Sequence, residues 1–385
     1  MRLALALSLL TTPVFAQCGG PLPAFLDGIR AEAATMGLSP DATERTLHGA
    51  AIDPGVLKAD RAQGVFQKDF VSFSRALISQ NRIDNGRIYG NRFDRTFDRI
   101  EANFGMPRGV ILAFWAFETD FGQVQGNFNT RNALVTLAHD CRRPELFRPQ
   151  LLAAIELTER GGWNPATTTG AWAGEIGQVQ MLPKDIIENG MDGDGDEVVD
   201  LKGSAPDALM SGANVLSSLG WRPNEPWLQE INVPANLDWA QTGLGRVKSG
   251  ADWAALGVTS RNGQIATNLD ASVLLPMGRN GPAFLAYPNF DVYFEWNKSF
   301  VYVTTAAYFA TRLQGGPVYD AGNPTAPLSG EQMKSLQQKL TNRGHDVGGI
   351  DGILGAKTRE AVQTEQSRLD LPADAWPTTA LLNAL

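Results

Sequence analysis

The chain has 385 residues, of which 43% are hydrophobic and 19% are charged, and this balance is typical of a folded protein of about two domains. The formal net charge of −8 argues against a nucleic-acid partner, because such proteins normally present a basic face. The three histidines, His48, His139 and His345, are scattered and lack the spacing of zinc ligands. Neither nucleic acid nor zinc is therefore expected.

The first residues predict a secretory signal peptide. An arginine at position 2 precedes the apolar run 3–10, and Ala16 ends a small-x-small cleavage site. The run is too short to span a bilayer. Cys18 leaves a lipid anchor as the alternative, but Gln17 directly before it fits a lipobox poorly. We therefore expect export with removal of residues 1–16.

Cys18 and Cys141 are the two cysteines of the chain, and both remain after this cleavage. In the oxidising compartment that an exported protein enters, they are expected to form one disulfide. This bond would tie the mature N-terminus to the body of the protein. Two free buried thiols are the alternative.

The body, residues 20–313, is predicted to be mainly α-helical with a small β element. Five stretches carry apolar residues at helical spacing and end at or near a glycine: 22–37, 95–105, 108–122, 149–162 and 205–221. Residues 230–285 are less periodic, and 271–278 and 281–287 there read as short strands.

Glu118 lies on the apolar stripe of the helix expected at 108–122. Helical spacing puts Ile111, Phe114 and Trp115 on the same stripe. Apolar surroundings and the negative helix C-terminus both raise the pKa of a carboxyl there, which favours an acid that donates a proton near neutral pH. The alternative is a glutamate whose head group reaches solvent or pairs with an arginine.

Glu118 has no obvious carboxylate partner. Glycoside cleavage usually needs two carboxylates. Asp120 is close in sequence but lies about 160° away around a helix. If the reaction is glycosidic, the missing group must therefore come from the substrate.

The stretch GAWAGEIGQVQMLP, residues 170–183, interleaves small residues with Trp172, Gln178 and Gln180. The glycines allow the backbone to approach a ligand closely, and the glutamine amides can bond sugar hydroxyl or acetamido groups. An ordinary tight loop is the alternative.

The acidic stretch 192–203 resembles an EF-hand calcium loop. Its odd positions from one to nine are Asp192, Asp194, Asp196, the Val198 carbonyl and Asp200. The match is incomplete, because Glu197 replaces the usual glycine and Gly203 the usual glutamate, so Asp207 is a candidate to complete the shell. We expect a structural Ca²⁺ site here, with a solvated acidic turn as the alternative.

Residues 314–328 interrupt the helical pattern with Gly, Pro and Asn and predict a linker. It would join the domain 17–313 to a compact module, 329–385. Ser329 and Gln332 have the spacing of a capping box, and two further helices follow a glycine-rich turn. A small, independent three-helix module is predicted.

Several motifs in this order resemble the membrane-bound lytic murein transglycosylase B family of peptidoglycan-cleaving enzymes. They are FWAFETDFG, GNFNTRNALVTLAHDCRRPELFR, GAWAGEIGQVQMLP, the DGDGD loop with PDAL, and YPNFDVYFEWNKSFVY. The end of the chain is similar to three-helix peptidoglycan-binding modules. The resemblance implies a lysozyme-like catalytic domain, peptidoglycan glycan strands as the partner, a periplasmic location and no cofactor for the chemistry.

The resemblance also implies that Glu118 is the single catalytic acid/base. It would protonate the glycosidic oxygen between N-acetylmuramic acid (MurNAc) and N-acetylglucosamine (GlcNAc). It would then take a proton from the muramic acid C6 hydroxyl, which attacks C1 and closes a 1,6-anhydro ring. The substrate thus supplies the group that the sequence lacks.

Substrate contacts are implied for a further set of residues: Arg142, Arg143, Trp172, Gln180, Asn297 and Tyr302. The two arginines are candidates for the peptide stem or the lactyl carboxylate. The chain departs from the family pattern at Ala171, where a serine is usual, at Trp296, where some members have a tyrosine, and at Glu365, where the binding module usually has an aromatic residue.

Two other functions remain open from the sequence. One is a hydrolytic muramidase that uses water, and the other is a catalytically silent wall-binding protein. Other periplasmic cell-wall enzymes are candidate protein partners, and a monomer is expected.

Overall fold

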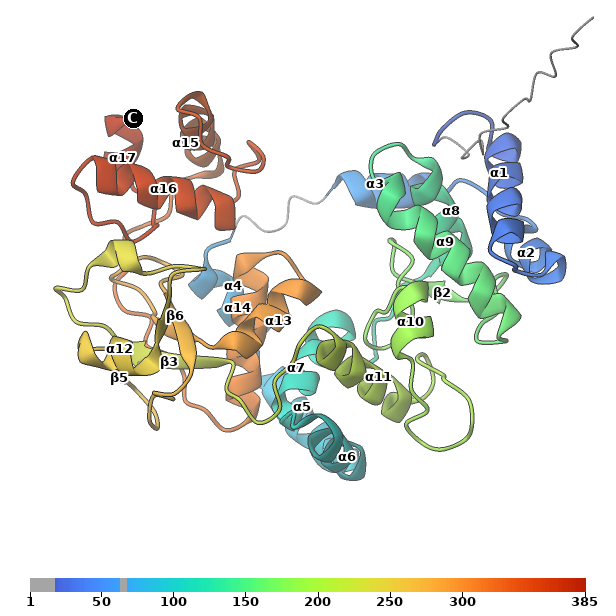
Figure 1. Cartoon of the computed structure of the whole chain (residues 1–385), viewed down its shortest axis with the longest axis horizontal. Coiled ribbons are helices and arrows are strands. Elements are labelled where there is room, and N and C mark those ends of the chain that lie inside the picture. Colours follow the sequence, from blue (N-terminus) through green and yellow to red (C-terminus); the bar gives the residue numbers. More distant parts are fainter. Residues whose placement is uncertain (1–17, 63–67) are drawn as a thin grey trace, which may run out of the picture. The chain divides into compact units, whose positions relative to one another are not determined.

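The computed structural model describes residues 18–62 and 68–385 (Figure 1). The signal peptide expected over residues 1–16 lies outside the described residues. Among the helices described, none has both the length and the apolar character needed to cross a membrane. The chain divides into a first unit, Met1–Arg61 with Gln125–Glu188, and a second unit, Ala62–Val124 with Asn189–Leu385.

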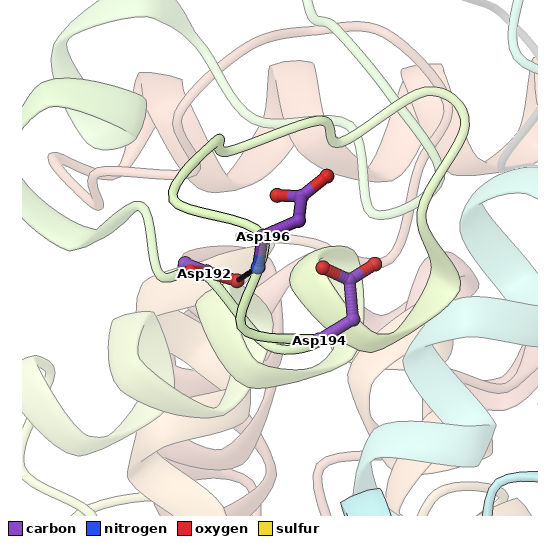
Figure 2. A group of neighbouring side chains, drawn as sticks. All are labelled: Asp192, Asp194 and Asp196. Carbon is purple, nitrogen blue, oxygen red and sulfur yellow. Dashed lines mark hydrogen bonds between the residues drawn. The ribbon is translucent and has the colours of Figure 1, made fainter.

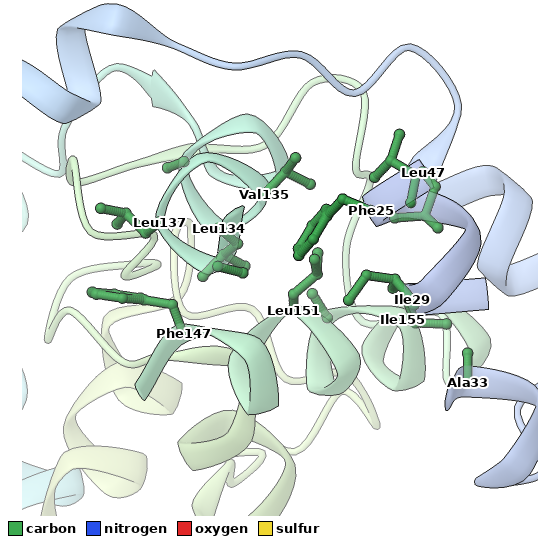
Figure 3. Packing of buried hydrophobic residues seen from close by; sticks show 14 of the residues in the cluster. Phe25, Ile29, Ala33, Leu47, Leu134, Val135, Leu137, Phe147, Leu151 and Ile155 are labelled. Carbon is green, nitrogen blue, oxygen red and sulfur yellow. The ribbon is translucent and has the colours of Figure 1, made fainter. Parts of the chain in front are cut away.

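The first unit is helical, and its elements are α1 (Leu22–Thr35), α2 (Pro40–Leu47), α3 (Pro54–Arg61), β1 (Phe128–Asn129), α8 (Thr130–His139), α9 (Pro144–Glu159), β2 (Thr169–Gly170) and α10 (Pro183–Asn189). Phe25 and Ile29 of α1 pack against Leu134 of α8 and Leu151 and Ile155 of α9 (Figure 3). The predicted disulfide between Cys18 and Cys141 is confirmed, so the alternative of two free thiols is wrong.

The helices of the second unit before its sheet are α4 (Phe70–Leu77), α5 (Gln80–Arg92), α6 (Asp94–Phe104), α7 (Arg108–Thr119) and α11 (Ala205–Ser218). After the sheet follow α13 (Pro288–Trp296) and α14 (Phe300–Leu313). Gly109 lets α7 approach α14 closely, because a Cβ there would lie 2.7 Å from the Ala310 carbonyl oxygen. The five predicted helices are all confirmed, although the one expected at 149–162 begins earlier, at Pro144, as α9.

The β element is a five-stranded antiparallel sheet in the order β4-β6-β7-β3-β5. The two predicted strands are confirmed as β6 (Asp270–Leu274) and β7 (Phe284–Ala286). The other strands, with the short helices beside them, were not predicted: β3 (Leu228–Asn232), η2 (Trp239–Gln241), β4 (Val247–Ser249), α12 (Gly250–Ala255) and β5 (Thr259–Ser260). The observed fold class is mainly α with a small β element, as expected.

The C-terminal module has the three predicted helices, α15 (Gly330–Asn342), α16 (Ala356–Arg368) and α17 (Thr379–Ala384). The capping box is also confirmed, because Ser329 and Gln332 bond each other's backbone amides. Leu336, Val362 and Leu381, one from each helix, meet in the small core of this module.

The module is not independent of the rest of the second unit, contrary to the expectation. The Gln363 side-chain amide of α16 donates to the carbonyl oxygens of Trp239 and Thr242, at 3.1 and 2.8 Å. The predicted linker has neither helix nor strand, yet its Tyr319 is buried and shares a 2.8 Å hydrogen bond with Ser74. A polar group of the module therefore finds its partners outside it, in the segment around η2 between β3 and β4.

Candidate active site

Glu118 lies in the last turn of α7 and is held by two neutral donors. The Trp296 indole Nε1 donates to Glu118 Oε1 at 3.0 Å, and the Tyr302 hydroxyl donates to the same oxygen at 2.6 Å. Arg82, the arginine close to this site, bonds Asp120 at 3.0 Å instead. Glu118 thus neither pairs with an arginine nor merely extends into solvent.

The surroundings of Glu118 favour its protonated form. Removal of water around the carboxyl raises its pKa, while the hydrogen bonds from Tyr302 and Trp296 lower it, and the net direction is upward. Burial, together with the nearby Glu118, also raises the pKa of the Tyr302 hydroxyl well above 10, so this group keeps its proton. The predicted direction for Glu118 is therefore confirmed, with desolvation as its physical cause.

Aromatic side chains fix the geometry around this carboxyl. Phe114 of α7 lies against the Trp296 ring, with centroids 4.7 Å apart, and stacks on Tyr293 at 4.9 Å. Phe117, one turn further along α7, contacts the Tyr302 ring at 5.8 Å. The helix that carries Glu118 therefore also supports both of its hydrogen-bond donors.

Helix α7 ends just after Glu118 for a conformational reason. Asp120 and Phe121 have φ angles of 51° and 60°, which a right-handed helix does not allow. Arg82 holds this turn, because it bonds Asp120 and also donates to the Leu77 carbonyl at 3.0 Å. Asp120 is thus engaged in shaping the turn, in agreement with its exclusion as a second acid.

Asn297 has a local structural role. Its side-chain oxygen accepts from the Ser299 amide at 2.9 Å in the turn between α13 and α14. The Ser299 hydroxyl in turn caps α14 at the Tyr302 amide. Asn297 therefore shapes the turn between the two donors of Glu118, and its substrate contact stays a prediction.

Arg142 and Arg143 both pair with Asp60 of α3 in the first unit. Burial alone would raise the pKa of Asp60, but the hydrogen bonds from the two guanidinium groups outweigh it and lower the pKa. The arginine side chains remain 42% and 32% exposed, so their outer faces are accessible to a ligand. Their predicted contact with a substrate carboxylate would therefore come in addition to Asp60.

The stretch 170–183 is a tight loop in the first unit. The Gln180 side-chain amide donates to the Gly177 carbonyl at 2.7 Å, and Trp172 packs against the core of this unit. Gly170 is required here, because a Cβ would lie 1.9 Å from the Glu175 carbonyl oxygen. This geometry agrees with the alternative of a tight loop, and the sugar contacts of Trp172 and Gln180 stay predictions.

The acidic loop brings three of the predicted calcium ligands together. Figure 2 shows Asp192, Asp194 and Asp196 on one turn, and one carboxylate oxygen from each lies within 4.8 Å of the others. This oxygen-only donor set fits a hard cation such as Ca²⁺. The set supplies fewer than the six to eight oxygens that Ca²⁺ takes, so water would have to complete it.

Asp207 is not among these three carboxylates, and its expected place in the metal shell stays a prediction. Its two carboxylate oxygens accept from the backbone amides of Gly193 and Asp200, at 2.9 and 2.7 Å. Asp207 is fully buried, and it fastens both ends of the loop. The exposed Val198 donates its own amide to Asp196 at 2.9 Å, and the predicted metal contact of its carbonyl stays a prediction.

Trp296 belongs to this candidate site, although the sequence assigned it no role. It was noted only as a departure from the family pattern, although it contacts Glu118 directly. An available signal was its position six residues before Tyr302, in the same motif. An indole N–H is a donor only, so it can serve a carboxyl in either protonation state.

Two known protein families match separate parts of this chain. Residues 22–311 match the family described as transglycosylase SLT domain, and residues 329–385 match a peptidoglycan binding domain family. The membrane-bound lytic murein transglycosylase B of Escherichia coli (strain K12) is 25% identical over 234 residues, which cover 60% of this chain and 63% of that relative.

Among solved structures, SltB3 from Pseudomonas aeruginosa in complex with NAG-anhNAM-pentapeptide is 34% identical. The match covers 95% of this chain and 99% of SltB3, with a TM-score of 0.86. The Escherichia coli lytic transglycosylase Slt35 in complex with calcium has the same fold, at 23% identity and a TM-score of 0.65 over 79% of this chain and 98% of Slt35. Because the family match spans residues 22–311, this chain belongs to the transglycosylase SLT domain family.

Proposed function

We propose that this protein is a lytic transglycosylase that cleaves the β-1,4 bond between MurNAc and GlcNAc in peptidoglycan. The observation that carries the proposal is Glu118 itself: its pKa is raised by desolvation, it accepts two hydrogen bonds from neutral donors, and neither donor is a carboxyl group. Family membership supports this class of reaction. The anhydro-sugar bound to SltB3, which resembles this chain over nearly its full length, supports ring closure in the product.

In this mechanism Glu118 first acts as an acid. Its proton passes to the glycosidic oxygen, the bond between that oxygen and C1 breaks, and the GlcNAc leaves as an alcohol. The carboxylate that remains keeps the hydrogen bonds from Trp296 and Tyr302, which stabilise its new charge. The substrate acetamido group and local dipoles would stabilise the cation at C1.

Glu118 then acts as a base. It accepts the proton of the muramic acid C6 hydroxyl while the C6 oxygen forms a bond to C1, and the 1,6-anhydro ring closes. The acid is regenerated and no water is consumed. One carboxyl therefore suffices for both steps, and the two hydrogen bonds described for Glu118 come from Trp296 and Tyr302 rather than from a second carboxyl group.

Digestion of purified murein tests this function. The expected muropeptides end in 1,6-anhydro-MurNAc and are one water lighter than reducing products, as mass spectrometry would show. Reducing ends alone would identify a hydrolytic muramidase. No release of muropeptides would identify a silent wall-binding protein.

We also propose that the mature protein is periplasmic without a lipid anchor. The bond to Cys141 occupies the Cys18 thiol that a lipid anchor would need. The module 329–385 would hold the enzyme on murein, since its sequence matches a peptidoglycan binding domain family. Glu365 of this module is buried and bonds His345 and Arg368, both at 2.8 Å, so it serves the module's own structure.

Calcium binding by the acidic loop is a separate proposal, with Asp192, Asp194 and Asp196 as the ligands. Sites of the extracellular type bind Ca²⁺ with a Kd of about 0.1–1 mM. Calcium at about ten times Kd should then stabilise the protein by about 1.4 kcal/mol, seen as a rise in Tm. Asp194→Asn should remove this rise, because it deletes one carboxylate of the cluster.

Glu101→Gln is the matched control, because Glu101 is an exposed carboxylate of α6, outside the loop. It should leave the calcium response unchanged. A Tm that does not move at about 10 mM calcium, or one that moves equally in Asp194→Asn, would contradict the site.

A further inference from the structure

The two donors to Glu118 bond the same oxygen. Both the Trp296 indole and the Tyr302 hydroxyl reach Oε1, at 3.0 and 2.6 Å, and neither is bonded to Oε2. A protonated carboxyl has one carbonyl oxygen, which accepts hydrogen bonds, and one hydroxyl oxygen, which donates its proton. The two oxygens of Glu118 therefore have different surroundings and are not equivalent.

We propose that Trp296 and Tyr302 are positioning residues that fix the catalytic proton of Glu118 on Oε2. Oε2 is then the oxygen that gives the proton to the leaving group and receives it back from the C6 hydroxyl. The transfer of this proton to and from the substrate rests on the proposed function, whereas the position of the proton on Oε2 does not.

The nature of the two donors supports this assignment. An indole N–H cannot accept a hydrogen bond, so Oε1 must be the acceptor in its contact with Trp296. The Tyr302 hydroxyl keeps its own proton because burial disfavours its anion. A proton on Oε1 would point away from both donors and weaken the acceptor that they share. Oε1 is therefore the carbonyl oxygen of the protonated carboxyl group.

The fold holds this arrangement rigidly. Trp296 ends α13 and Tyr302 lies in the first turn of α14, and the turn between these helices is capped by Asn297 and Ser299. Phe114, on the same helix as Glu118, lies against the Trp296 ring. The donors and the carboxyl therefore keep a fixed relation, and the carboxyl cannot exchange its two oxygens without losing both bonds.

Arg82 and Tyr293, which lie against Phe117 and Phe114 of this site, do not supply a competing proton donor. Arg82 of α5 is engaged by Asp120 and by the Leu77 carbonyl, and it acts on Tyr302 only through its charge. Tyr293 of α13, also buried, has a pKa raised well above 10 and stays neutral. The position of the Glu118 proton is thus set by Trp296 and Tyr302.

This arrangement has a consequence for both chemical steps. After the proton leaves Oε2, the donors remain on Oε1 and hold the negative charge without any movement. The lone pair of Oε2 still points to the position that the proton occupied. One oxygen therefore serves as acid and as base, and the carboxyl does not rotate between the steps.

Infrared difference spectroscopy tests the assignment without murein. Spectra are recorded as the pH is lowered. Subtracting the spectrum of Glu118→Gln from that of the wild type isolates the C=O stretch of protonated Glu118, and its frequency is measured once the band no longer grows. Hydrogen bonds to a carbonyl lower its stretching frequency. We expect a low frequency in the wild type, a higher one in Trp296→Phe and in Tyr302→Phe, and the highest one in the double variant.

Trp163→Phe is the matched control, because the Trp163 indole donates to the Ala154 carbonyl in the first unit. It should leave the band unchanged. A wild-type band at the frequency of a free carbonyl, or one that stays in place in both donor variants, would overturn the proposal. Either result would leave the proposed function standing, since no substrate takes part.

The pH profile of murein cleavage separates positioning from a merely structural role. Loss of one donor destabilises the Glu118 carboxylate and raises its pKa further, so the alkaline limb of kcat/KM should move to higher pH. The kcat of Trp296→Phe should fall by about 10- to 100-fold, as expected for a hydrogen bond to a charged group. Trp296→Tyr, which keeps a donor on an aromatic ring, should recover part of this loss. A lower kcat with an unmoved limb would contradict a positioning role.

Discussion

Glu118→Gln should lower the rate of murein solubilisation by about 10²- to 10⁴-fold, the range that general acid catalysis contributes. The amide has no proton to give at neutral pH, and it cannot accept the C6 hydroxyl proton. Its oxygen can still accept from Trp296 and Tyr302, so the variant should fold and still bind murein. The decrease in turbidity of a murein suspension measures the rate, and circular dichroism checks the fold.

Asp120→Asn is the informative control for this prediction. Asp120 lies two residues from Glu118 but is bonded to Arg82 at the end of α7. Its variant should keep most of the activity. An equal loss in both variants, with the fold of each unchanged by circular dichroism, would mean that a second carboxylate takes part. Full activity of Glu118→Gln would remove Glu118 from the chemistry.

The wild-type pH profile should show the raised pKa of Glu118. The protonated form is the active one in the first step, so activity is present below this pKa and is lost as the pH rises through it. Because desolvation raises the pKa above the ordinary glutamate value of 4.5, the alkaline limb should lie above that value. A limb at the ordinary value would contradict the apolar setting of the acid.

Removing the disulfide should have the largest effect on stability. Cys18 and Cys141 are 123 residues apart, and a crosslink across so long a loop restricts the unfolded chain strongly. Cys18→Ser combined with Cys141→Ser should lower the free energy of unfolding of the first unit by about 2–5 kcal/mol. Urea unfolding, followed by hydrogen exchange of α1, α8 and α9, measures this change.

The local contacts of the disulfide agree with this expectation. Next to Cys18, the Gly19 amide donates to the His139 carbonyl at 2.8 Å, and the His139 ring bonds the Gly20 carbonyl at 3.0 Å. A reductant should destabilise the wild type and leave the double variant unchanged. Equal stability of wild type and double variant would show that these neighbouring bonds hold the N-terminus without the disulfide.

Local patterns in the sequence predicted the part of the fold that carries Glu118. The apolar stripe of α7 and the glycines that follow the helices are properties of nearby residues, and the structure confirms them. Strands β3, β4 and β5 were missed because, unlike β6 and β7, they carry no continuous apolar run. β4 pairs with β6, β3 pairs with β7, and β5 pairs with β3, so their place depends on these partners rather than on their own sequence.

Contacts between distant residues account for the other differences. Asp60 is 82 residues from Arg142, so nothing local predicted their ion pair. The bonds of Gln363 to Trp239 and Thr242 likewise join parts of the chain more than a hundred residues apart. The hydrogen bonds that Asp207 accepts from two backbone amides of the acidic loop were likewise not predicted from its charge.

The most direct test of the central claim is digestion of purified murein in water enriched in heavy oxygen, followed by mass spectrometry. In the proposed reaction the C6 oxygen of the substrate closes the ring, so the released muropeptides should be one water lighter and carry no heavy oxygen. Glu118→Gln should release none above its background. Muropeptides with heavy oxygen at reducing muramic acid ends would show that water attacks, and would contradict the mechanism.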